Sequence, residues 1–374
     1  MRKFLAFMMV LSITILSTAV VVAQDGDVEA TPEATEALEP WVCPPGFEGQ
    51  HLSIYNWSTY IADNTVPDFE KACGVTVSYD IYDSNEAMLA RIRQGNPGYD
   101  IVVPSDYTIT QMAREGLLEP LDMSKIPNFK NIDPELQNPP YDPGNQYSVP
   151  YQWGTVGIGY NTETVTEPIT TWQQMFDYQG RVAWLDDNRA MFGIALTMLG
   201  DDPNTTDQTQ IDAAKQYLID HGSNVVTIAS DDGQAWLQRG DVDMTVEYSG
   251  DIFALADDCG CDTYAYVIPE EGSNIWIDNL AIPKDAPNPD LAMAFINYVL
   301  DPQVGADISN YTAYATPNKA SIDLGLIDQD LLDNPAIYPN EELMKKLFFI
   351  TDSPPDVETA YNNAWDEVII YVGQ

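Results

Sequence analysis

The stretch Glu271-Gly272-Ser273-Asn274-Ile275-Trp276-Ile277-Asp278-Asn279-Leu280-Ala281-Ile282-Pro283 has the pattern of a β-strand entered through a glycine turn and ended by a proline. Successive side chains of a strand point to opposite faces, so Trp276 and Asp278 share one face while Ile275 and Ile277 share the other. An indole ring beside a carboxylate suits an organic cation, because the ring attracts positive charge and the carboxylate pairs with an ammonium. The alternative is a half-exposed strand whose tryptophan and aspartate lie at the surface.

Composition restricts the class of protein and the class of ligand. The chain has 374 residues, enough for two domains of ordinary size, and 45% of them are hydrophobic, which indicates a globular protein. The formal net charge of −42 argues against nucleic acid, whose phosphates would be repelled, and against anionic membrane surfaces. This charge is compatible with a cationic ligand, but a solubilising acidic surface would also explain it.

The first part of the chain has the features of an export signal. Residues 1–23 start with two basic residues, continue as an apolar run and end in Val21-Val22-Ala23, so we expect a signal peptide that is cut after this triplet. The run is also long enough for an uncleaved membrane anchor, which would tether the protein. Residues 24–48 are predicted to be an acidic spacer. We therefore expect an exported protein, in the periplasm or at the cell surface.

The four cysteines, Cys43, Cys73, Cys259 and Cys261, are disulfide candidates in an oxidising compartment. A Cys43–Cys73 bond would tie the segment before the first strand to the end of the first helix, and a Cys259–Cys261 bond would close a small ring. We expect no metal site, since the chain has two histidines and no zinc-ligand spacing around its cysteines. No cofactor is expected either, because Walker-type and dinucleotide glycine motifs are absent from the sequence.

Strands and helices alternate along most of the chain, which predicts an α/β fold with two doubly wound, mostly parallel sheets. The first sheet is expected to contain the strands 52–56, 75–81 and 100–103. Two further strands, 147–152 and 156–161, precede the second sheet. That sheet is expected to contain the strands 181–185, 225–228, 244–248 and 264–268.

Polar and aromatic residues follow several of these strands at their carboxyl ends, where ligands bind in open α/β sheets. The clusters are Trp57-Ser58-Thr59-Tyr60, Ser105-Asp106-Tyr107, Asp186-Asp187 and Tyr248-Ser249-Gly250-Asp251. Two lobes of similar size leave a cleft between them. We expect the clusters to meet Trp276 and Asp278 in that cleft.

A series of short motifs spans nearly all of residues 50–374. In order they are Tyr55-Asn56-Trp57-Ser58-Thr59-Tyr60, Tyr82-Asp83-Ser84-Asn85-Glu86, Tyr99-Asp100-Ile101-Val102-Val103-Pro104-Ser105, Asn131-Ile132-Asp133-Pro134, Val149-Pro150-Tyr151-Gln152-Trp153-Gly154, Val156-Gly157-Ile158-Gly159-Tyr160-Asn161, Asp278-Asn279-Leu280-Ala281-Ile282-Pro283 and Thr316-Pro317-Asn318. Taken together they resemble the periplasmic spermidine/putrescine-binding proteins of bacterial ABC importers, which are type II extracellular solute-binding proteins. The resemblance implies the two-lobe periplasmic-binding-protein type II fold.

The resemblance also implies which residues bind the ligand. These are the aromatic residues Trp57, Tyr60, Tyr107, Tyr248, Trp276 and Tyr314, the carboxylates Asp187, Asp251 and Asp278, and the hydroxyls Ser58 and Ser105. The chemistry is consistent, because rings cover the methylenes of a polyamine while carboxylates replace the water around each ammonium.

Two positions depart from the family pattern. Thr59 and Ala190 stand where relatives place acids, so two negative charges are missing from the expected cleft. Binding of an amine at either place would require compensation by Asp106 or Glu247. Glu247 neighbours Tyr248 on a strand and is expected to face away from the cleft.

The implied function is capture of putrescine or spermidine outside the cytoplasm and delivery to an ABC transporter permease, without enzymatic activity. The protein is expected to be a monomer that closes two lobes on its ligand by a hinge motion. Lobe I is predicted to comprise residues 49–154 and 279–322. Lobe II is predicted to comprise residues 155–278 and 323–374.

Two alternatives stay open. The same fold would also hold another organic cation, a small solute or ferric iron, the last through phenolate ligands from the 21 tyrosines. A hydrolase would use paired carboxylates, such as Asp186 or Asp187 with Asp251 or Asp278. With 58 acidic residues, however, chance pairs of carboxylates are common.

Overall fold

The computed structural model describes residues 39–372, so the predicted signal peptide and residues 24–38 of the predicted spacer lie outside the described residues. The strands are β1 (His51–Trp57), β2 (Thr76–Tyr82), β3 (Ile101–Val102), β4 (Ser148–Asn161), β5 (Val182–Leu185), β6 (Val225–Ala229), β7 (Met244–Tyr248), β8 (Tyr264–Val267) and β9 (Ile275–Ala281). The first helices are α1 (Thr65–Cys73), α2 (Asn85–Arg93), α3 (Asp106–Arg114), the 3-10 helices η1 (Met123–Lys125) and η2 (Pro127–Asn131), α4 (Trp172–Phe176), α5 (Asn188–Leu199) and α6 (Gln208–His221). The later helices are α7 (Gly233–Gln238), α8 (Ser249–Cys259), α9 (Pro289–Val299), α10 (Pro302–Thr312), α11 (Lys319–Asp323), α12 (Gln329–Leu332), α13 (Glu341–Met344) and α14 (Pro355–Val372). Between residues 39 and 372, no helix combines the length and hydrophobicity that crossing a bilayer requires.

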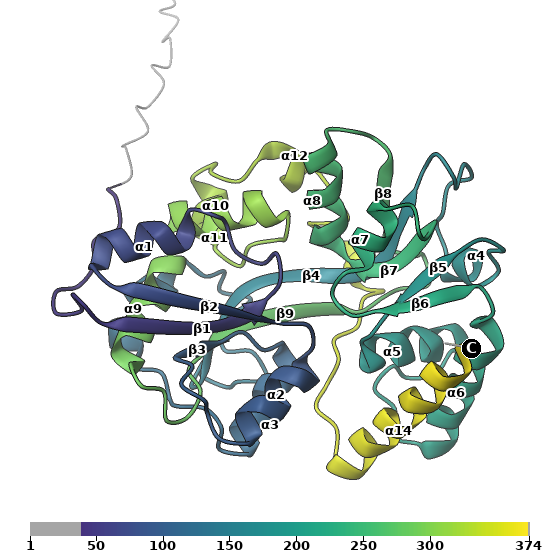
Figure 1. Ribbon diagram of the computed structural model, residues 1–374, viewed down its shortest axis with the longest axis horizontal. Coiled ribbons are helices and arrows are strands. Elements are labelled where there is room, and N and C mark those ends of the chain that lie inside the picture. Colours follow the sequence, from purple (N-terminus) through teal and green to yellow (C-terminus); the bar gives the residue numbers. More distant parts are fainter. Residues whose placement is uncertain (1–38, 373–374) are drawn as a thin grey trace, which may run out of the picture. The chain divides into compact units, whose positions relative to one another are not determined.

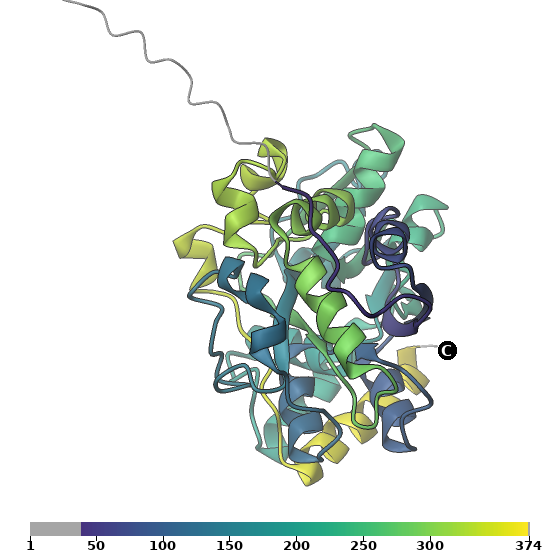
Figure 2. The ribbon, with the colours of Figure 1, turned by 90° about the vertical axis from the view of Figure 1, so that its left-hand side faces the viewer.

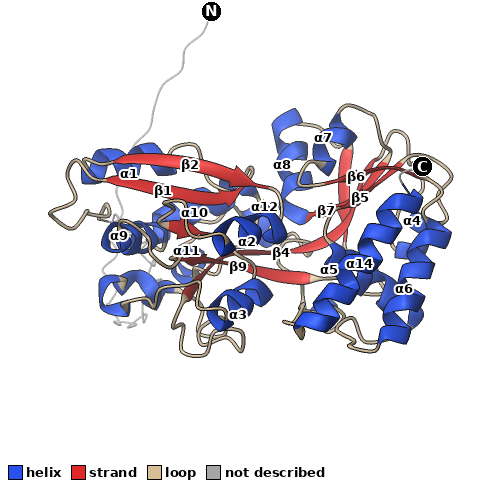
Figure 3. Ribbon diagram, turned by 60° about the horizontal axis from the view of Figure 1, so that its bottom comes forward, coloured by secondary structure: helices blue, strands red, loops and turns tan. Residues whose placement is uncertain are grey.

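The strands pair in the order β2-β1-β3-β9-β4-β7-β5-β6, and β8 pairs with β4. β1 is parallel to β2 and β3, and β5 is parallel to β6 and β7. We call these two parallel sets, with the helices that pack on them, the β1 half and the β5 half. β4 and β9 pair antiparallel with each other and link the two halves (Figure 3). The predicted α/β fold with two parallel sets of strands is confirmed, with this antiparallel pair between them.

β4 is one continuous strand, whereas the sequence predicted two strands, 147–152 and 156–161. Its first part pairs with β9 and its second part, from Val156 onward, pairs with β7, so it belongs to both halves. Gly154 lies next to this change of partner, and a Cβ atom there would lie 2.8 Å from the Trp276 ring. Gly154, which lies in the gap between the two predicted strands, therefore makes room for an aromatic ring.

Helices cover both halves. In the β1 half, α1 packs against α9, where the rings of Phe69 and Phe295 lie 5.0 Å apart, so the beginning of the chain and a late helix form one layer (Figures 1 and 2). In the β5 half, α14 packs against α5 and α6 and buries Tyr361, Trp365 and Val368.

Two disulfides join the pairs of cysteines that the sequence suggested. Cys43–Cys73 links the segment before β1 to the end of α1, and Cys259–Cys261 closes a small ring at the end of α8. The first disulfide closes a loop that contains β1 and α1, so it restricts the unfolded chain more than the second.

β9 is buried along its whole length, so the alternative of a half-exposed strand is wrong. Its side chains alternate as the sequence predicted. Trp276 and Asp278 line one pocket, whereas Ile275 and Ile277 line a separate hollow on the opposite face.

Candidate functional site

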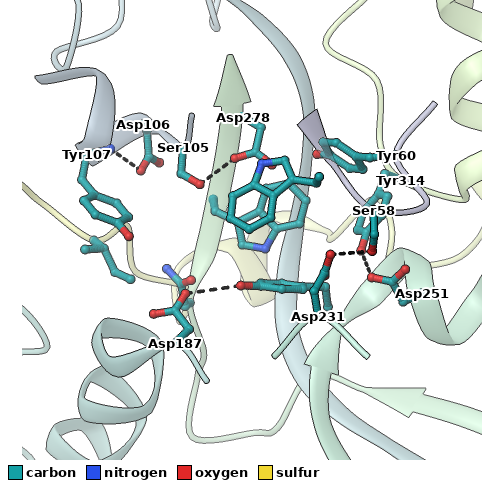
Figure 4. A pocket seen from close by; sticks show the side chains of 15 residues that line it. Ser58, Tyr60, Ser105, Asp106, Tyr107, Asp187, Asp231, Asp251, Asp278 and Tyr314 are labelled. Carbon is teal, nitrogen blue, oxygen red and sulfur yellow. Dashed lines mark hydrogen bonds between the residues drawn. The ribbon is translucent and has the colours of Figure 1, made fainter. Parts of the chain in front are cut away.

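A pocket lies between the β1 half and the β5 half, and Figure 4 shows it from close by. We call it the central pocket, and it is lined by Trp57, Ser58, Tyr60, Ser105, Asp106, Tyr107, Asp187, Asp231, Tyr248, Asp251, Asn274, Trp276, Asp278, Tyr314 and Ile350. It holds about 480 Å³ of space between atoms, including the part that is open to solvent. All eleven residues that the sequence predicted to bind a ligand line this pocket.

The carboxyl ends of strands bring these residues together. Trp57 ends β1, Ser105 lies between β3 and α3, Asp187 lies between β5 and α5, and Tyr248 ends β7. The strand ends of the two halves face each other across β4 and β9, so loops that are far apart in the sequence meet at one place. This is the position where open α/β sheets bind ligands.

Four of the six aromatic residues that line the pocket pack together as a ring cluster. The centroid of Trp276 lies 5.3 Å from that of Tyr314 and 5.7 Å from that of Tyr248, and Tyr60 lies 5.1 Å from Tyr314. Tyr60 and Trp276 are 4% and 7% exposed, yet the Tyr60 hydroxyl and Trp276 Nε1 have no hydrogen-bond partner among the described residues. Buried polar atoms usually have partners, so a ligand with polar groups fits this ring cluster.

On the β1 side of the pocket, Asp278 and Asp106 are buried. Ser105 Oγ donates a hydrogen bond to Asp278 Oδ1 at 2.6 Å, and the backbone N–H of Tyr107 donates to Asp106 Oδ1 at 2.7 Å. Burial raises the pKa of Asp278 to about 7, against the opposing effect of the Ser105 hydrogen bond. Burial also raises the pKa of Asp106 to about 8.

On the β5 side, Asp251 and Asp187 line the pocket. Asp251 accepts hydrogen bonds from Thr59 Oγ1 at 2.9 Å and from the Tyr314 hydroxyl at 2.5 Å, and burial raises its pKa to about 6. Asp187 caps α5 by accepting from the Ala190 N–H at 2.9 Å, and burial raises its pKa as well.

The pocket is rich in carboxyl groups. Five aspartates line it, and none of the residues that line it in the described part of the chain is lysine, arginine or histidine. Buried carboxylates without a positive partner are costly, and this cost is what raises their pKa values. A cation inside the pocket would favour the ionised carboxylates, so the arrangement is complementary to a positively charged solute with apolar parts.

The pocket tyrosines do not favour ferric iron. Burial raises the pKa of Tyr60, Tyr107, Tyr248 and Tyr314 well above the ordinary value of a phenol, and nearby carboxylates raise it further. Phenolate ligands would therefore form at additional cost. Among residues 39–372, no group of three or more His, Cys, Asp or Glu side chains is arranged to hold a metal ion, a result that does not concern tyrosine ligands.

Sequence reasoning missed part of the lining. Asp231 follows β6, and the rule that polar residues gather after strand ends would have found it there. Asn274 lies two residues before Trp276, and strand alternation places it on the same face. Asp106 was considered only as a compensating charge, and no pattern in the sequence points to Ile350.

The two positions that depart from the family pattern have other roles here. Thr59 donates its hydroxyl to Asp251, and the backbone of Ala190 donates to Asp187. Glu247 does not line the pocket, in agreement with the prediction, and accepts from the N–H groups of Gln234 and Tyr248.

Comparison with known proteins places the chain in a family. Residues 64–338 match the family described as bacterial extracellular solute-binding protein. The chain is 35% identical to the putrescine-binding periplasmic protein SpuD of Pseudomonas aeruginosa over 336 residues, which are 85% of this chain and 91% of that protein. It is 36% identical to the spermidine/putrescine-binding periplasmic protein of Escherichia coli over 298 residues, which are 79% of this chain and 84% of that protein.

Comparison with a solved structure supports the same family. The putative spermidine/putrescine ABC transporter from Listeria monocytogenes superimposes with a TM-score of 0.81 at 36% identity, covering 86% of this chain and 99% of that one. These relatives are solute-binding components of transporters and not enzymes, so the hydrolase hypothesis is set aside. The chain belongs to the bacterial extracellular solute-binding proteins.

Proposed function

We propose that the chain captures a polyamine of the putrescine or spermidine type outside the cytoplasm and delivers it to an ABC permease. The observation that carries this proposal is the central pocket, in which buried carboxylates surround a cluster of aromatic rings and no basic side chain of residues 39–372 lines the space. A polyamine matches both parts, since its methylenes pack on rings and its ammonium groups pair with carboxylates. Relatives named for putrescine and spermidine support this choice of ligand class.

The position of the charges favours an elongated cation. Asp278 belongs to β9 and Asp251 to α8, and each has its own hydroxyl donors, Ser105 for the first and Thr59 and Tyr314 for the second. The charges of both aspartates contribute to the raised pKa of Tyr60, which therefore lies near the two carboxylates. A diamine with one ammonium at each carboxylate and its methylenes against Tyr60 and Trp276 would satisfy this arrangement.

Hydrogen bonds between the β1 half and the β5 half support closure of two lobes on the ligand. Thr59 donates to Asp251, and Gln111 Nε2 of α3 donates to the Glu358 carboxylate of α14 at 3.0 Å. We keep residues 49–154 as the first segment of lobe I, because β4 changes its partner strand from β9 to β7 close to the end of this segment, between Thr155 and Val156. A hinge in β4 and β9 would let the two halves separate.

Besides β4 and β9, the chain would cross between the lobes a third time. We propose that this third crossing lies after residue 322. Asn310 of α10 bonds to the backbone of Leu326 and Asp328, and the hydroxyl of Tyr338 accepts from the N–H of Thr316. These bonds hold residues 326–338 to the side of α10. We therefore propose that the crossing lies between Tyr338 and Phe348. The backbone carbonyl of Phe348 accepts a hydrogen bond from the N–H of Ile275 in β9.

Proteins of this family are extracellular. For this chain we propose in addition how it is exported and which oligomeric state it has. Residues 1–23 would direct export, residues 24–48 would separate the binding domain from the membrane if the leader is retained, and the protein would act as a monomer. Fractionation of producing cells checks the location, and light scattering checks the mass in solution. Protein retained in the cytoplasm would contradict the location.

The ligand is tested by titration calorimetry of the purified protein, refolded to remove bound host solutes, with putrescine and with spermidine. We expect saturable heat with a 1:1 stoichiometry and a rise in melting temperature. Absence of both effects with both compounds, in folded protein, rejects the proposed function.

A further inference from the structure

Asp231 is a carboxylate of the central pocket that reaches it from a loop without any sequence motif. It lies between β6 and α7 and therefore belongs to the β5 half. Its Oδ2 accepts a hydrogen bond from Ser58 Oγ at 2.6 Å, and Ser58 follows β1. This bond joins the two halves across the pocket (Figure 4).

Asp231 and Asp251 occupy the same end of the pocket. Their hydroxyl donors are consecutive residues, because Ser58 bonds to Asp231 and Thr59 bonds to Asp251. Burial raises the pKa of Asp231, and the charge of Asp251 is the next cause of the shift. Two carboxylates thus lie close together, and no basic side chain among the described lining residues faces them.

Thr59 adopts a backbone conformation that is unusual for its type. Its φ of 47° lies in the left-handed region, which a β-branched side chain rarely enters. Such strain persists when the surroundings hold it, and here the Thr59 hydroxyl donates to Asp251. A hydrogen-bond donor at position 59 offsets part of the repulsion between the carboxylates of Asp251 and Asp231. An acidic side chain at position 59 would increase this repulsion.

We propose that Asp231 and Asp251 together bind one terminal ammonium group of the ligand and make this end of the pocket selective for a primary amine. The inference rests on the proposed function and names the residues that bind one end of the ligand. A primary ammonium has three N–H donors, and two carboxylates present four oxygens in one place. The hydroxyls of Ser58, Thr59 and Tyr314 already bond to three of these oxygens, which holds the carboxylates in position.

The test compares the wild-type protein with Asp231→Asn and Asp232→Asn by calorimetry with putrescine at pH 8. Asparagine keeps the carbonyl oxygen that accepts from Ser58, so the first variant removes charge and preserves the link between the halves. Asp232 is exposed, does not line the pocket and bonds through its side chain to Trp236 at 3.2 Å, so the second variant removes the same charge one residue away.

We expect Asp231→Asn to bind putrescine about 10- to 100-fold more weakly, the effect of losing a charge-assisted hydrogen bond, and Asp232→Asn to bind within about twofold of wild type. A loss below about threefold in Asp231→Asn, or an equal loss in both variants, overturns the inference. If the wild-type protein binds neither putrescine nor spermidine, the proposed function fails as well. Tight wild-type binding with an unaffected Asp231→Asn overturns the inference alone.

A double variant moves the charge across the pocket. In Thr59→Asp/Asp231→Asn, the new acid stands next to Ser58 and beside Asp251, to which the Thr59 hydroxyl bonds. Aspartate also tolerates the left-handed conformation of position 59 better than threonine. We expect it to bind putrescine at least about fivefold more tightly than Asp231→Asn, because the lost charge-assisted bond is partly restored. A double variant that melts as a folded protein and shows no recovery contradicts the inference.

Discussion

Two acidic regions lie next to each other and share Tyr60, yet they differ in every property that matters for binding. The central pocket holds about 480 Å³ and its aspartates lie among rings. The second region, which we call the groove, holds about 2730 Å³ and is lined by the end of α8, by α10 and by α12. Its acids are Asp63, Asp257, Asp258, Asp262, Asp328 and Asp330, and all six are exposed.

The difference shows that negative charge alone does not make a binding site in a chain with a net charge of −42. An exposed carboxylate is hydrated already and gains little from a cation. A buried carboxylate has lost its water, so a cation that replaces the water is bound strongly. We expect the central pocket to determine affinity and the groove to affect only the rate at which cations arrive.

The largest effect is expected from Asp278→Asn. Removing one partner of a buried charge pair costs several kcal/mol, so putrescine affinity should fall about 100-fold or more in calorimetry. Asp258→Asn in the groove is the matched control, and its affinity should stay within about twofold of wild type, the range of an exposed pair. Equal losses in the two variants would show that overall charge, and not burial, drives binding.

The next effect concerns the rings. Trp276→Ala removes a face for the ligand and should weaken binding about 30-fold, which corresponds to about 2 kcal/mol for a desolvated cation on an indole. Tyr311 lines the groove and is 52% exposed, so Tyr311→Ala should change the affinity little. Melting temperatures of both ligand-free variants separate a loss of binding from a loss of folding.

A smaller but more specific effect is expected from pH. The pKa values of about 7 for Asp278 and about 6 for Asp251 mean that a cation must displace protons below neutral pH. Affinity for putrescine should therefore fall at least about tenfold from pH 8 to pH 5.5. Calorimetry in two buffers of different ionisation enthalpy should show that protons are released on binding near pH 6.5. Affinity that is constant over this range would contradict the raised pKa values.

The same groups determine how the stability of the ligand-free protein depends on pH. Because the pKa of Asp278 rises from 3.8 to about 7 on burial, the folded protein holds more protons than the unfolded chain between these values. The contribution of Asp278 to the free energy of unfolding therefore falls as pH rises through this range. Asp278→Asn should remove part of this dependence in urea unfolding curves, and an identical dependence in variant and wild type would speak against it.

The smallest effect is expected from the groove. Asp257→Asn/Asp258→Asn should slow association with spermidine about twofold at low salt and have no effect at 0.5 M salt, because exposed charges act over distance and are screened. Stopped-flow fluorescence of the pocket tryptophans measures the rate. A salt-independent change would indicate that the groove contacts the ligand directly.

Much of the site could be predicted because it depends on local pattern. The alternation in β9 separated Trp276 and Asp278 from Ile275 and Ile277, and the strand ends pointed to Ser58 and Tyr248. The errors arose where contacts between distant segments decide the outcome. The sequence predicted two strands with Gly154 in the gap between them, but β4 is continuous and the Trp276 ring packs against it at Gly154.

The sequence by itself determined the α/β class, the faces of its strands and the residue types at their ends, because these follow from short-range periodicity and chain stereochemistry. Only the tertiary structure decided that Ser58 meets Asp231 and that Thr59 meets Asp251, since each pair joins residues more than 170 positions apart. Which loops face each other depends on how β4 and β9 connect the two halves. The local sequence of a loop does not determine that arrangement.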